Sequence, residues 1–330
     1  MLDKNNNDYQ KLSFLKLNKF WDQNETNKDY YYLNKYHLTN KVELIETAHK
    51  NNLLTHTKFD DQIVMSNSNL SDPNKIHLFV KAGQDGRSQG ACPFCQAVFL
   101  QLLVKAKTNK FNFDVLTINV DNPPREFKEL SLKPPVLIHG NSKLLDNNCE
   151  SESEAVVLSD VDEIAEYLDR LYPNSPLVVV NPDAKRVSLN VFSKFSFFIR
   201  EVASKTNSLE SELEKIDNYL RQINTGDLSK VIFMNGSSQM TLLDCSLLPK
   251  LQHIRIAGES IKQFRIPQKF NFLWKYLKNA YESDCFQKSC PPDREIIWHW
   301  SKNFLTHKNL LQLIQEAPYK TLTLPDDLKL

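Results

Sequence analysis

The stretch from Lys75 to Phe99, KIHLFVKAGQDGRSQGACPFCQAVF, holds the features that decide the fold. Its apolar run, Ile76 to Val80, suits a buried strand, and the glycine-rich segment after it suits a loop. Apolar residues then recur with helical spacing from Pro93 to Lys107. Two cysteines, Cys92 and Cys95, stand where the predicted strand leads into the predicted helix. The pair raises three hypotheses: a redox centre, part of a metal site, or two thiols packed as small hydrophobic side chains.

The residues after this helix predict a small mixed α/β domain. FDVLTINV (113–120) and KPPVLIHG (133–140) each predict a strand, and NPPREFKEL (122–130) between them predicts a short helix. A polar segment follows, and SDVDEIAEYLDRLYP then predicts a helix that is capped by Ser159 or Asp160 and ends before Pro173. Strands and helices that alternate in this way are typical of an α/β domain.

Beyond PNSP, at 173–176, almost every segment carries apolar residues at helical spacing. The segments predicted to be helical are 182–203, 208–223, 240–257, 266–283 and 290–305. The third of them opens with Thr241 and has Asp244 three residues later, which is the pattern of a capping box. We therefore predict an α/β domain over 73–175 and an all-helical domain over 176–305.

The two ends of the chain lie outside these domains. Residues 1–72 are rich in Asn and Lys, and they predict a largely flexible N-terminal extension with one transient helix near 38–52. Such a segment buries too little apolar surface to offset the entropy lost on ordering. Residues 306–330 are predicted to form a C-terminal tail.

Composition and charge exclude several classes of protein. The 41 Lys and Arg residues are balanced by 40 Asp and Glu residues, so no excess of positive charge favours a nucleic-acid partner. The six cysteines lack the dense spacing of a disulfide framework, and the first residues contain no apolar stretch of secretory length. No apolar run reaches the roughly 20 residues that a membrane-spanning helix needs. We expect a reducing, cytoplasmic location, where a close cysteine pair is more often reactive than structural.

The cysteine pair favours redox chemistry, with Cys92 as the attacking thiolate and Cys95 as the resolving thiol. A cysteine at a helix N-terminus faces unpaired backbone N–H groups and the positive end of the helix dipole, and both lower its pKa. Pro93 suits the first helical turn, where its missing N–H is not needed. Cys95 lies one turn later on the same face and is placed to resolve a mixed disulfide. The alternative is that both thiols pack as small hydrophobic side chains.

We predict no metal site. Zinc needs four ligands in a closed site, and no second Cys-x-x-Cys motif exists. Cys285 and Cys290, taken with His299 and His307, depart from the usual finger spacing. The remaining cysteines are interpreted as ordinary thiols: Cys149, Cys245 and Cys285.

Three blocks of the sequence resemble the chloride intracellular channel family of the glutathione S-transferase superfamily. They are LFVKAGQDGRSQGACPFCQAVF (78–99), MTLLDCSLLPKLQHIRIAGESIKQFRIP (240–267) and LWKYLKNAYESDCFQKSCPPDREI (273–296). The resemblance extends from Asn74 to Ser301 and implies a thioredoxin-like domain followed by an all-helical domain, in a glutathione S-transferase-like fold. Many members carry Ser at the position of Cys95, so this chain resembles an invertebrate-type member with a CPFC motif.

The resemblance also implies function. It implies a protein that associates conditionally with membrane lipids and conducts chloride ions, and glutaredoxin-like thiol chemistry through Cys92. The segment that corresponds to the membrane-inserting part of the family is 92–120. Charged residues near a bilayer centre are costly, and this segment contains four of them: Lys105, Lys107, Lys110 and Asp114.

The family pattern further implies a glutathione site made by Pro135, in a cis peptide, together with Ser159 and Asp160. The residue before Pro135 is Pro134, which lacks an N–H, so one hydrogen bond to the cysteine of glutathione cannot form. The acidic stretch at 159–162 attracts the ammonium of the γ-glutamyl end and repels its carboxylate. We therefore expect glutathione to bind weakly.

Three functions stay open on the sequence alone. The first is a chloride intracellular channel-like protein, and the second is a cytosolic, glutathione-dependent oxidoreductase that uses Cys92 and Cys95. The third is a non-enzymatic scaffold that binds partners such as cytoskeletal proteins. A detoxifying transferase is not expected, because Cys92 stands where the resemblance places the Ser or Tyr that activates glutathione.

Overall fold

The structure is a computed structural model, and it describes residues 75–124, 127–128, 130–139, 156–201, 205–224, 232–301 and 306–328. The predicted N-terminal extension lies outside these residues, as do Cys149 and three positions, 125, 126 and 129, of the helix predicted at 122–130. Within that predicted helix, Phe127 and Lys128 are helical.

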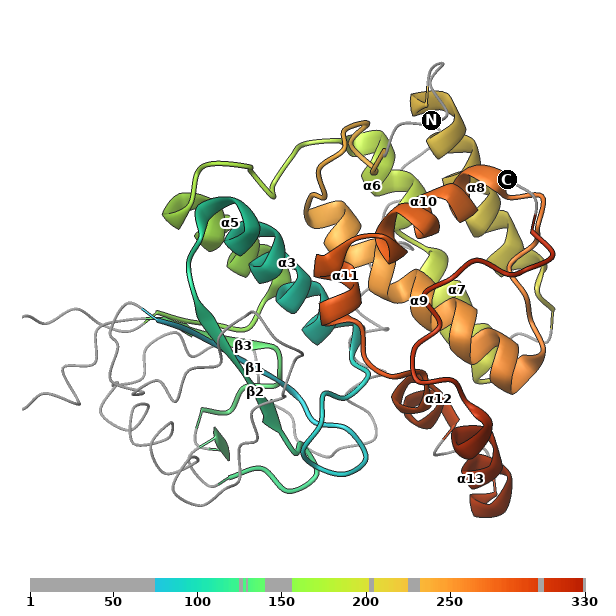
Figure 1. Cartoon of the computed structure of the whole chain (residues 1–330), viewed down its shortest axis with the longest axis horizontal. Helices are drawn as coiled ribbons and strands as arrows, with labels where there is room; N and C mark the ends of the chain where they lie inside the picture. The colour runs from blue at the N-terminus through green and yellow to red at the C-terminus, as the bar shows by residue number, and fades with distance from the viewer. Residues whose placement is uncertain are drawn as a thin grey trace, which may run out of the picture. The chain divides into compact units, whose positions relative to one another are not determined.

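A four-stranded mixed sheet forms one layer of the first domain (Figure 1). Its strands are β1 (Ile76–Lys81), β2 (Phe113–Ile118), β3 (Val136–His139) and β4 (Val156–Leu158), in the spatial order β2–β1–β3–β4. Strand β1 pairs in parallel with β2, whereas β3 is antiparallel to both β1 and β4. Nearly all of β1 and the whole of β2 are buried, which explains their continuous apolar sequences.

Helices α3 (Pro93–Asn109) and α5 (Val161–Leu171) pack on one face of this sheet. Helix α3 provides the crossover between the parallel strands β1 and β2. The opposite face carries a smaller apolar cluster made of Phe79, Leu116, Ile118, Phe127, Val136 and Ile138. The α/β fold predicted for this part of the chain is thus confirmed.

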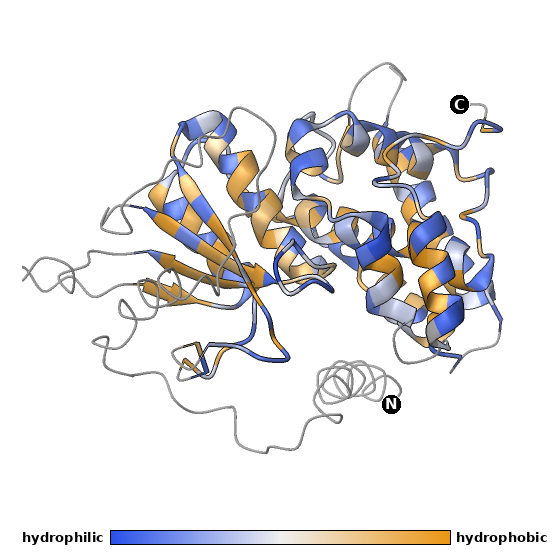
Figure 2. Cartoon of the chain, turned by 60° about the horizontal axis from the view of Figure 1, so that its bottom comes forward, coloured by the Kyte–Doolittle hydropathy of each residue, from blue (hydrophilic) through white to orange (hydrophobic). Residues whose placement is uncertain are grey.

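Helix α3 is buried on all sides between two layers. Residues 95–105 are all buried, because the helix contacts β1 and α5 in its own domain and α9 and α11 in the next. A helix surrounded by protein needs apolar side chains around its whole circumference, and Figure 2 shows hydrophobic residues along most of it. In the part of the chain that the structure describes, no helix has both the length and the apolar character needed to cross a bilayer.

The predicted all-helical domain is also confirmed. Its helices are α6 (Pro182–Ser188), α7 (Val191–Ile199), α8 (Asn207–Ile223), α9 (Leu242–Lys262), α10 (Asn271–Tyr281), α11 (Asp284–Ser289) and α12 (Asp293–Ser301). The segment predicted as helical at 182–203 forms two helices with a break at Leu189 and Asn190. Serine hydroxyls on both sides of the break donate to backbone carbonyls three residues earlier, and such local bonds compete with regular helix.

Helix α9 contacts α6, α7 and α12 of this domain as well as α3, and the predicted capping box begins it. The Thr241 N–H and hydroxyl donate to Asp244 Oδ2 at 2.8 and 2.9 Å. Asp244 Oδ1 accepts from the Met234 N–H and the Tyr276 hydroxyl, each at 2.8 Å. Burial raises the pKa of Asp244, and these four hydrogen bonds oppose that rise.

The region predicted as a C-terminal tail contains helix α13 (His307–Glu316) and a segment, 317–328, that packs on the helical domain. Asp293 accepts from the N–H and hydroxyl of Thr321 at 3.0 and 2.5 Å. Arg255 donates to the Thr323 carbonyl at 2.6 Å. The segment therefore satisfies polar groups of α9 and α12 that are buried beneath it.

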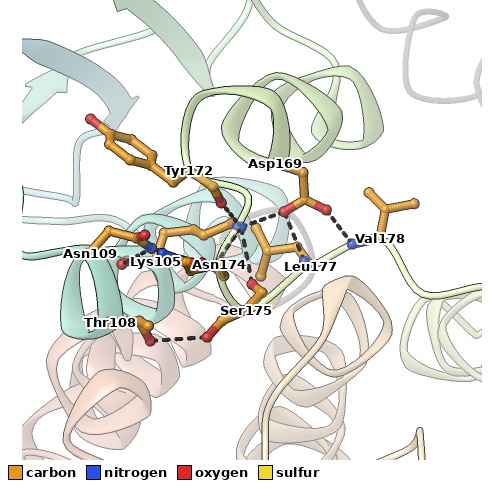
Figure 3. A network of polar contacts seen from close by, with 9 residues as sticks. All are labelled: Lys105, Thr108, Asn109, Asp169, Tyr172, Asn174, Ser175, Leu177 and Val178. Carbon is orange, nitrogen blue, oxygen red and sulfur yellow. Dashed lines mark hydrogen bonds and ion pairs between the residues drawn. The ribbon is translucent and has the colours of Figure 1, made fainter.

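The C-terminal half of α3 is joined to the connection between the domains through Lys105 (Figure 3). The Lys105 side chain is completely buried, and its Nζ lies 2.6 Å from Asp169 Oδ1. Nζ also donates to three backbone carbonyls, at 2.6, 3.4 and 3.0 Å: those of Tyr172, Asn174 and Ser175. We call Lys105, Asp169 and these carbonyls the Lys105 network. Its acceptors replace the water that a charged amine would otherwise require.

Candidate active site

The topology of the sheet brings the predicted site residues to one end of it. Cys92 follows β1, whereas Pro135 directly precedes β3, which is antiparallel to β1. Phe79 pairs with Val136, so Pro135 lies beside the end of β1. Strand β4 runs back toward the same end, where Ser159 and Asp160 follow it.

Cys92 occupies the N-cap of α3, as predicted. Its backbone is extended (φ −121°, ψ 114°), and Pro93 is the first helical residue. The Cys92 side chain is half-buried, whereas that of Cys95 is completely buried. Cys95 Sγ accepts a hydrogen bond from the Lys81 N–H at 3.4 Å, which ties the second thiol to the end of β1.

The site lowers the pKa of Cys92 from an ordinary 9.0 to about 7. The largest cause is a hydrogen bond from the Cys95 thiol, which stabilises the Cys92 thiolate. Burial acts in the opposite direction, and the backbone N–H groups of Cys95 and Phe94 and the charge of Lys81 lower the pKa further. About half of the Cys92 side chains are therefore thiolate near pH 7.

The pKa values of the two thiols shift in opposite directions. Burial, followed by the contact with Cys92, raises the pKa of Cys95 well above its ordinary value. Cys95 therefore keeps its proton and donates a hydrogen bond to the Cys92 thiolate. One sulfur is thus nucleophilic and partly exposed, while the other is protonated and adjacent. This asymmetry is what a dithiol exchange reaction requires.

The glycine-rich loop before Cys92 is attached to the helical domain. The Gln84 N–H donates to Glu295 Oε2 at 2.9 Å, and Gln89 Nε2 donates to the Ser289 carbonyl at 2.7 Å. Only glycine fits at position 90, because a Cβ atom there would lie 2.3 Å from the Ala82 carbonyl oxygen. These contacts hold the chain where it enters α3.

The residues predicted to hold glutathione lie at the same end of the sheet as Cys92. The Pro134–Pro135 peptide is cis, as the family pattern implied. Asp160, and not Ser159, caps α5: its Oδ1 accepts from the N–H groups of Asp162 and Glu163 at 2.9 and 3.0 Å. The Asp160 side chain is exposed, so its negative charge faces solvent at the site. Pro134, which precedes the cis bond, has no N–H to donate.

The other thiols of the described residues are poorly placed for reaction. Cys245, Cys285 and Cys290 are buried and unpaired. Burial raises the pKa of each of them, and that of Cys290 reaches about 12. Within residues 75–328, apart from the gaps given above, no three His, Cys, Asp or Glu side chains are grouped to hold a metal ion.

The sequence analysis did not identify two basic residues near the pair. Lys81 is the last residue of β1, and its charge lowers the pKa of Cys92. Lys250 lies on α9, in the other domain, with Nζ 5.8 Å from the centre of the Phe94 ring. No local sequence pattern marks Lys250, because only the packing of α3 against α9 brings it to the site.

Comparison with known proteins agrees with this architecture. The family model of the CLIC-like N-terminal domain matches residues 74–161. The chain is 31% identical over 278 residues to "Chloride intracellular channel Clic" of Drosophila melanogaster, a match that covers 79% of this chain and 94% of that protein.

Two solved structures are similar over most of their length. The CLIC homologue EXC-4 from C. elegans superposes with a TM-score of 0.64 at 26% identity, covering 78% of this chain and 96% of that one. The dehydroascorbate reductase of Chlamydomonas reinhardtii gives a TM-score of 0.57 at 28% identity, covering 69% of this chain and 97% of that one.

Proposed function

The chain belongs to the chloride intracellular channel family, and we propose that it acts as a thiol–disulfide oxidoreductase of the glutaredoxin type. The observation that carries this proposal is the asymmetry of the cysteine pair. Cys92 is half-buried with a pKa of about 7, and the protonated Cys95 is hydrogen-bonded to it. A reducing cytoplasm is the location in which such a pair would stay ready to react.

The reaction proceeds in two exchange steps. The Cys92 thiolate attacks one sulfur of a substrate disulfide, forms a mixed disulfide and releases the other sulfur as a thiolate, which takes up a proton. Cys95 then loses its proton and attacks the Cys92 sulfur, which releases the second substrate thiolate. The substrate gains two electrons, and the pair is left as a Cys92–Cys95 disulfide.

A small thiol must then reduce this disulfide, and we propose glutathione as that substrate. Two glutathione molecules would supply the two electrons and leave as glutathione disulfide. The cis Pro135 and the start of α5 suit the tripeptide, whereas the missing N–H of Pro134 weakens its binding. We therefore expect millimolar glutathione to raise the melting temperature of the chain only slightly. A clear stabilisation would contradict weak binding.

The test of the oxidoreductase is reduction of a small disulfide with glutathione as the reductant, comparing the chain with Cys92→Ser. We expect Cys92→Ser to show only the rate of glutathione alone. Cys245→Ser, which changes another cysteine of the described residues, is the control and should keep its rate. Equal rates for the chain and Cys92→Ser would overturn the role of Cys92. Dehydroascorbate is a second substrate to test, because a similar structure is named as its reductase.

A second candidate function is association with membranes and conduction of chloride. It is supported by family membership and by the name of the Drosophila relative. In the form described here, α3 is buried between two layers, so insertion of 92–120 would require α3 to leave both of them. The test is flotation of the full chain with lipid vesicles, followed by chloride efflux from the same vesicles. A lack of flotation contradicts association, and flotation without efflux contradicts conduction.

A further inference from the structure

A lysine of the helical domain lies against the first turn of α3, which begins at the proposed nucleophile. Lys250 Nζ is 5.8 Å from the centre of the Phe94 ring and 6.0 Å from that of Phe192 on α7. The two rings meet edge to face, with centres 6.5 Å apart. Phe94 lies two residues after Cys92, and 42% of it is exposed. A cation and two aromatic rings therefore lie at the first turn of α3, which Cys92 caps.

The charge of Lys250 has no close counter-ion. Among the residues that the structure describes, Lys250 makes neither a hydrogen bond nor an ion pair. Burial lowers the pKa of Lys250, and Asp162 at the start of α5 opposes this effect through a longer-range interaction. The contrast with Lys105 is clear, because Lys105 is buried with a carboxylate and three carbonyls around its amine. A half-buried amine held mainly by aromatic rings gains much from a bound anion.

We propose that Lys250, together with the rings of Phe94 and Phe192, binds the anionic group of the disulfide that Cys92 reduces. The inference rests on the oxidoreductase function proposed above and adds a substrate class to it: small disulfides that carry a carboxylate next to an apolar or aromatic group. The rings would cover the apolar part of such a substrate, while the amine would contact its carboxylate. The chemical steps at the two cysteines are unchanged.

A purely structural role for Lys250 predicts something different. If its amine only joins α9 to α3 and α7 through the two rings, its loss should affect neutral and anionic substrates alike. If it binds the substrate, its loss should affect anionic disulfides alone. A pair of substrates that differ in charge therefore separates the two roles.

The experiment measures the rate at which the reduced chain reacts with one equivalent of disulfide. The anionic probe is 5,5′-dithiobis(2-nitrobenzoate), which carries two carboxylates, and the neutral probe is 2,2′-dithiodipyridine. In Lys250→Gln we expect an approximately tenfold loss of rate with the dianion, the equivalent of one charge-assisted contact, and little change with the neutral probe. Lys250→Arg should keep most of the rate with the dianion. Added salt should slow the dianion reaction of the parent chain more than that of Lys250→Gln.

The matched control is Lys275→Gln. Lys275 on α10 is also half-buried, with Nζ 6.0 Å from the centre of the Phe272 ring, but it lies outside the site. Its rates should equal those of the parent chain with both probes. Equal losses with both probes in Lys250→Gln, or no loss with either, would overturn the inference while leaving the oxidoreductase intact. A parent chain that reacts with neither probe would refute the oxidoreductase itself.

Discussion

The two ends of helix α3 differ in how far their polar groups are satisfied. At the N-terminal end, Cys92 is half-buried, and the backbone N–H groups of Phe94 and Cys95 face its sulfur, with no acidic side chain in the first turn to compete for them. Toward the C-terminal end, Lys105 is completely buried, and its amine has a carboxylate and three carbonyls as partners. Satisfied polar groups therefore hold this helix in place, whereas the less satisfied polar groups near its start are available for chemistry.

The largest effect should come from breaking the Lys105 network. Lys105→Met removes the cation and leaves Asp169 and three carbonyls without it, so we expect a loss of about 3–5 kcal/mol in the free energy of unfolding. Chemical denaturation measures this loss. The control is Lys107→Met in the exposed last turn of α3, which should cost less than about 0.5 kcal/mol. A loss for Lys105→Met as small as that of the control would show that the network is not a main support of α3.

A smaller effect is expected at the loop that leads into α3. In Gly90→Ala the added Cβ would lie 2.3 Å from the Ala82 carbonyl oxygen, so the loop must shift. We expect a loss of about 1–3 kcal/mol in stability, typical of overpacking. The same shift should slow alkylation of Cys92, because it moves the entry to the helix. Unchanged stability and alkylation would mean that the loop is not needed to position Cys92.

Removing the hydrogen bond within the cysteine pair tests what lowers the pKa of Cys92 at the N-terminal end of α3. The Cys95 thiol is the largest cause of the lowered pKa of Cys92, so Cys95→Ala should raise that pKa from about 7 toward 9.0. Alkylation by iodoacetamide, followed against pH by mass spectrometry, should then have its midpoint at a higher pH. At pH 7 the rate should fall several-fold, because less of Cys92 is thiolate.

Cys95→Ser is the matched variant for this measurement, since its hydroxyl still donates a hydrogen bond. Its midpoint should lie between those of the parent chain and Cys95→Ala. In the parent chain the rate should fall about tenfold for each pH unit well below 7, as the thiolate takes up its proton. A midpoint that does not move in Cys95→Ala would assign the low pKa to the helix start and the charge of Lys81.

The smallest effect is expected from removing the negative charge of Asp162, which interacts with Lys250. Asp162 offsets part of the field of Lys250, so Asp162→Asn should raise the rate with the dianionic disulfide by about twofold or less at low salt. The rate with the neutral disulfide should not change. A faster reaction with both probes would instead indicate a general change at the start of α5.

Local patterns in the sequence were sufficient for the elements that frame the site. The apolar run of β1 predicted a strand, and the glycine-rich segment after it predicted a loop. The proline after Cys92 and the apolar spacing of α3 predicted a helix that begins at the first cysteine. The capping box of α9 was equally local, because Thr241 and Asp244 are three residues apart. In each case the interacting groups lie within a few positions, so the residues themselves specify the contact.

Other features depended on which elements meet in space. Neither the burial of Lys105 against the chain at 169–175 nor the position of Lys250 beside Phe94 has a local signal.

By itself, therefore, the sequence determined the order of the elements and placed the reactive cysteine at the start of a helix, because short-range geometry controls both. Only the tertiary structure decided which charges around that helix are satisfied and which are left for a ligand. That balance depends on contacts between residues that are far apart in the chain, and burial sets their strength.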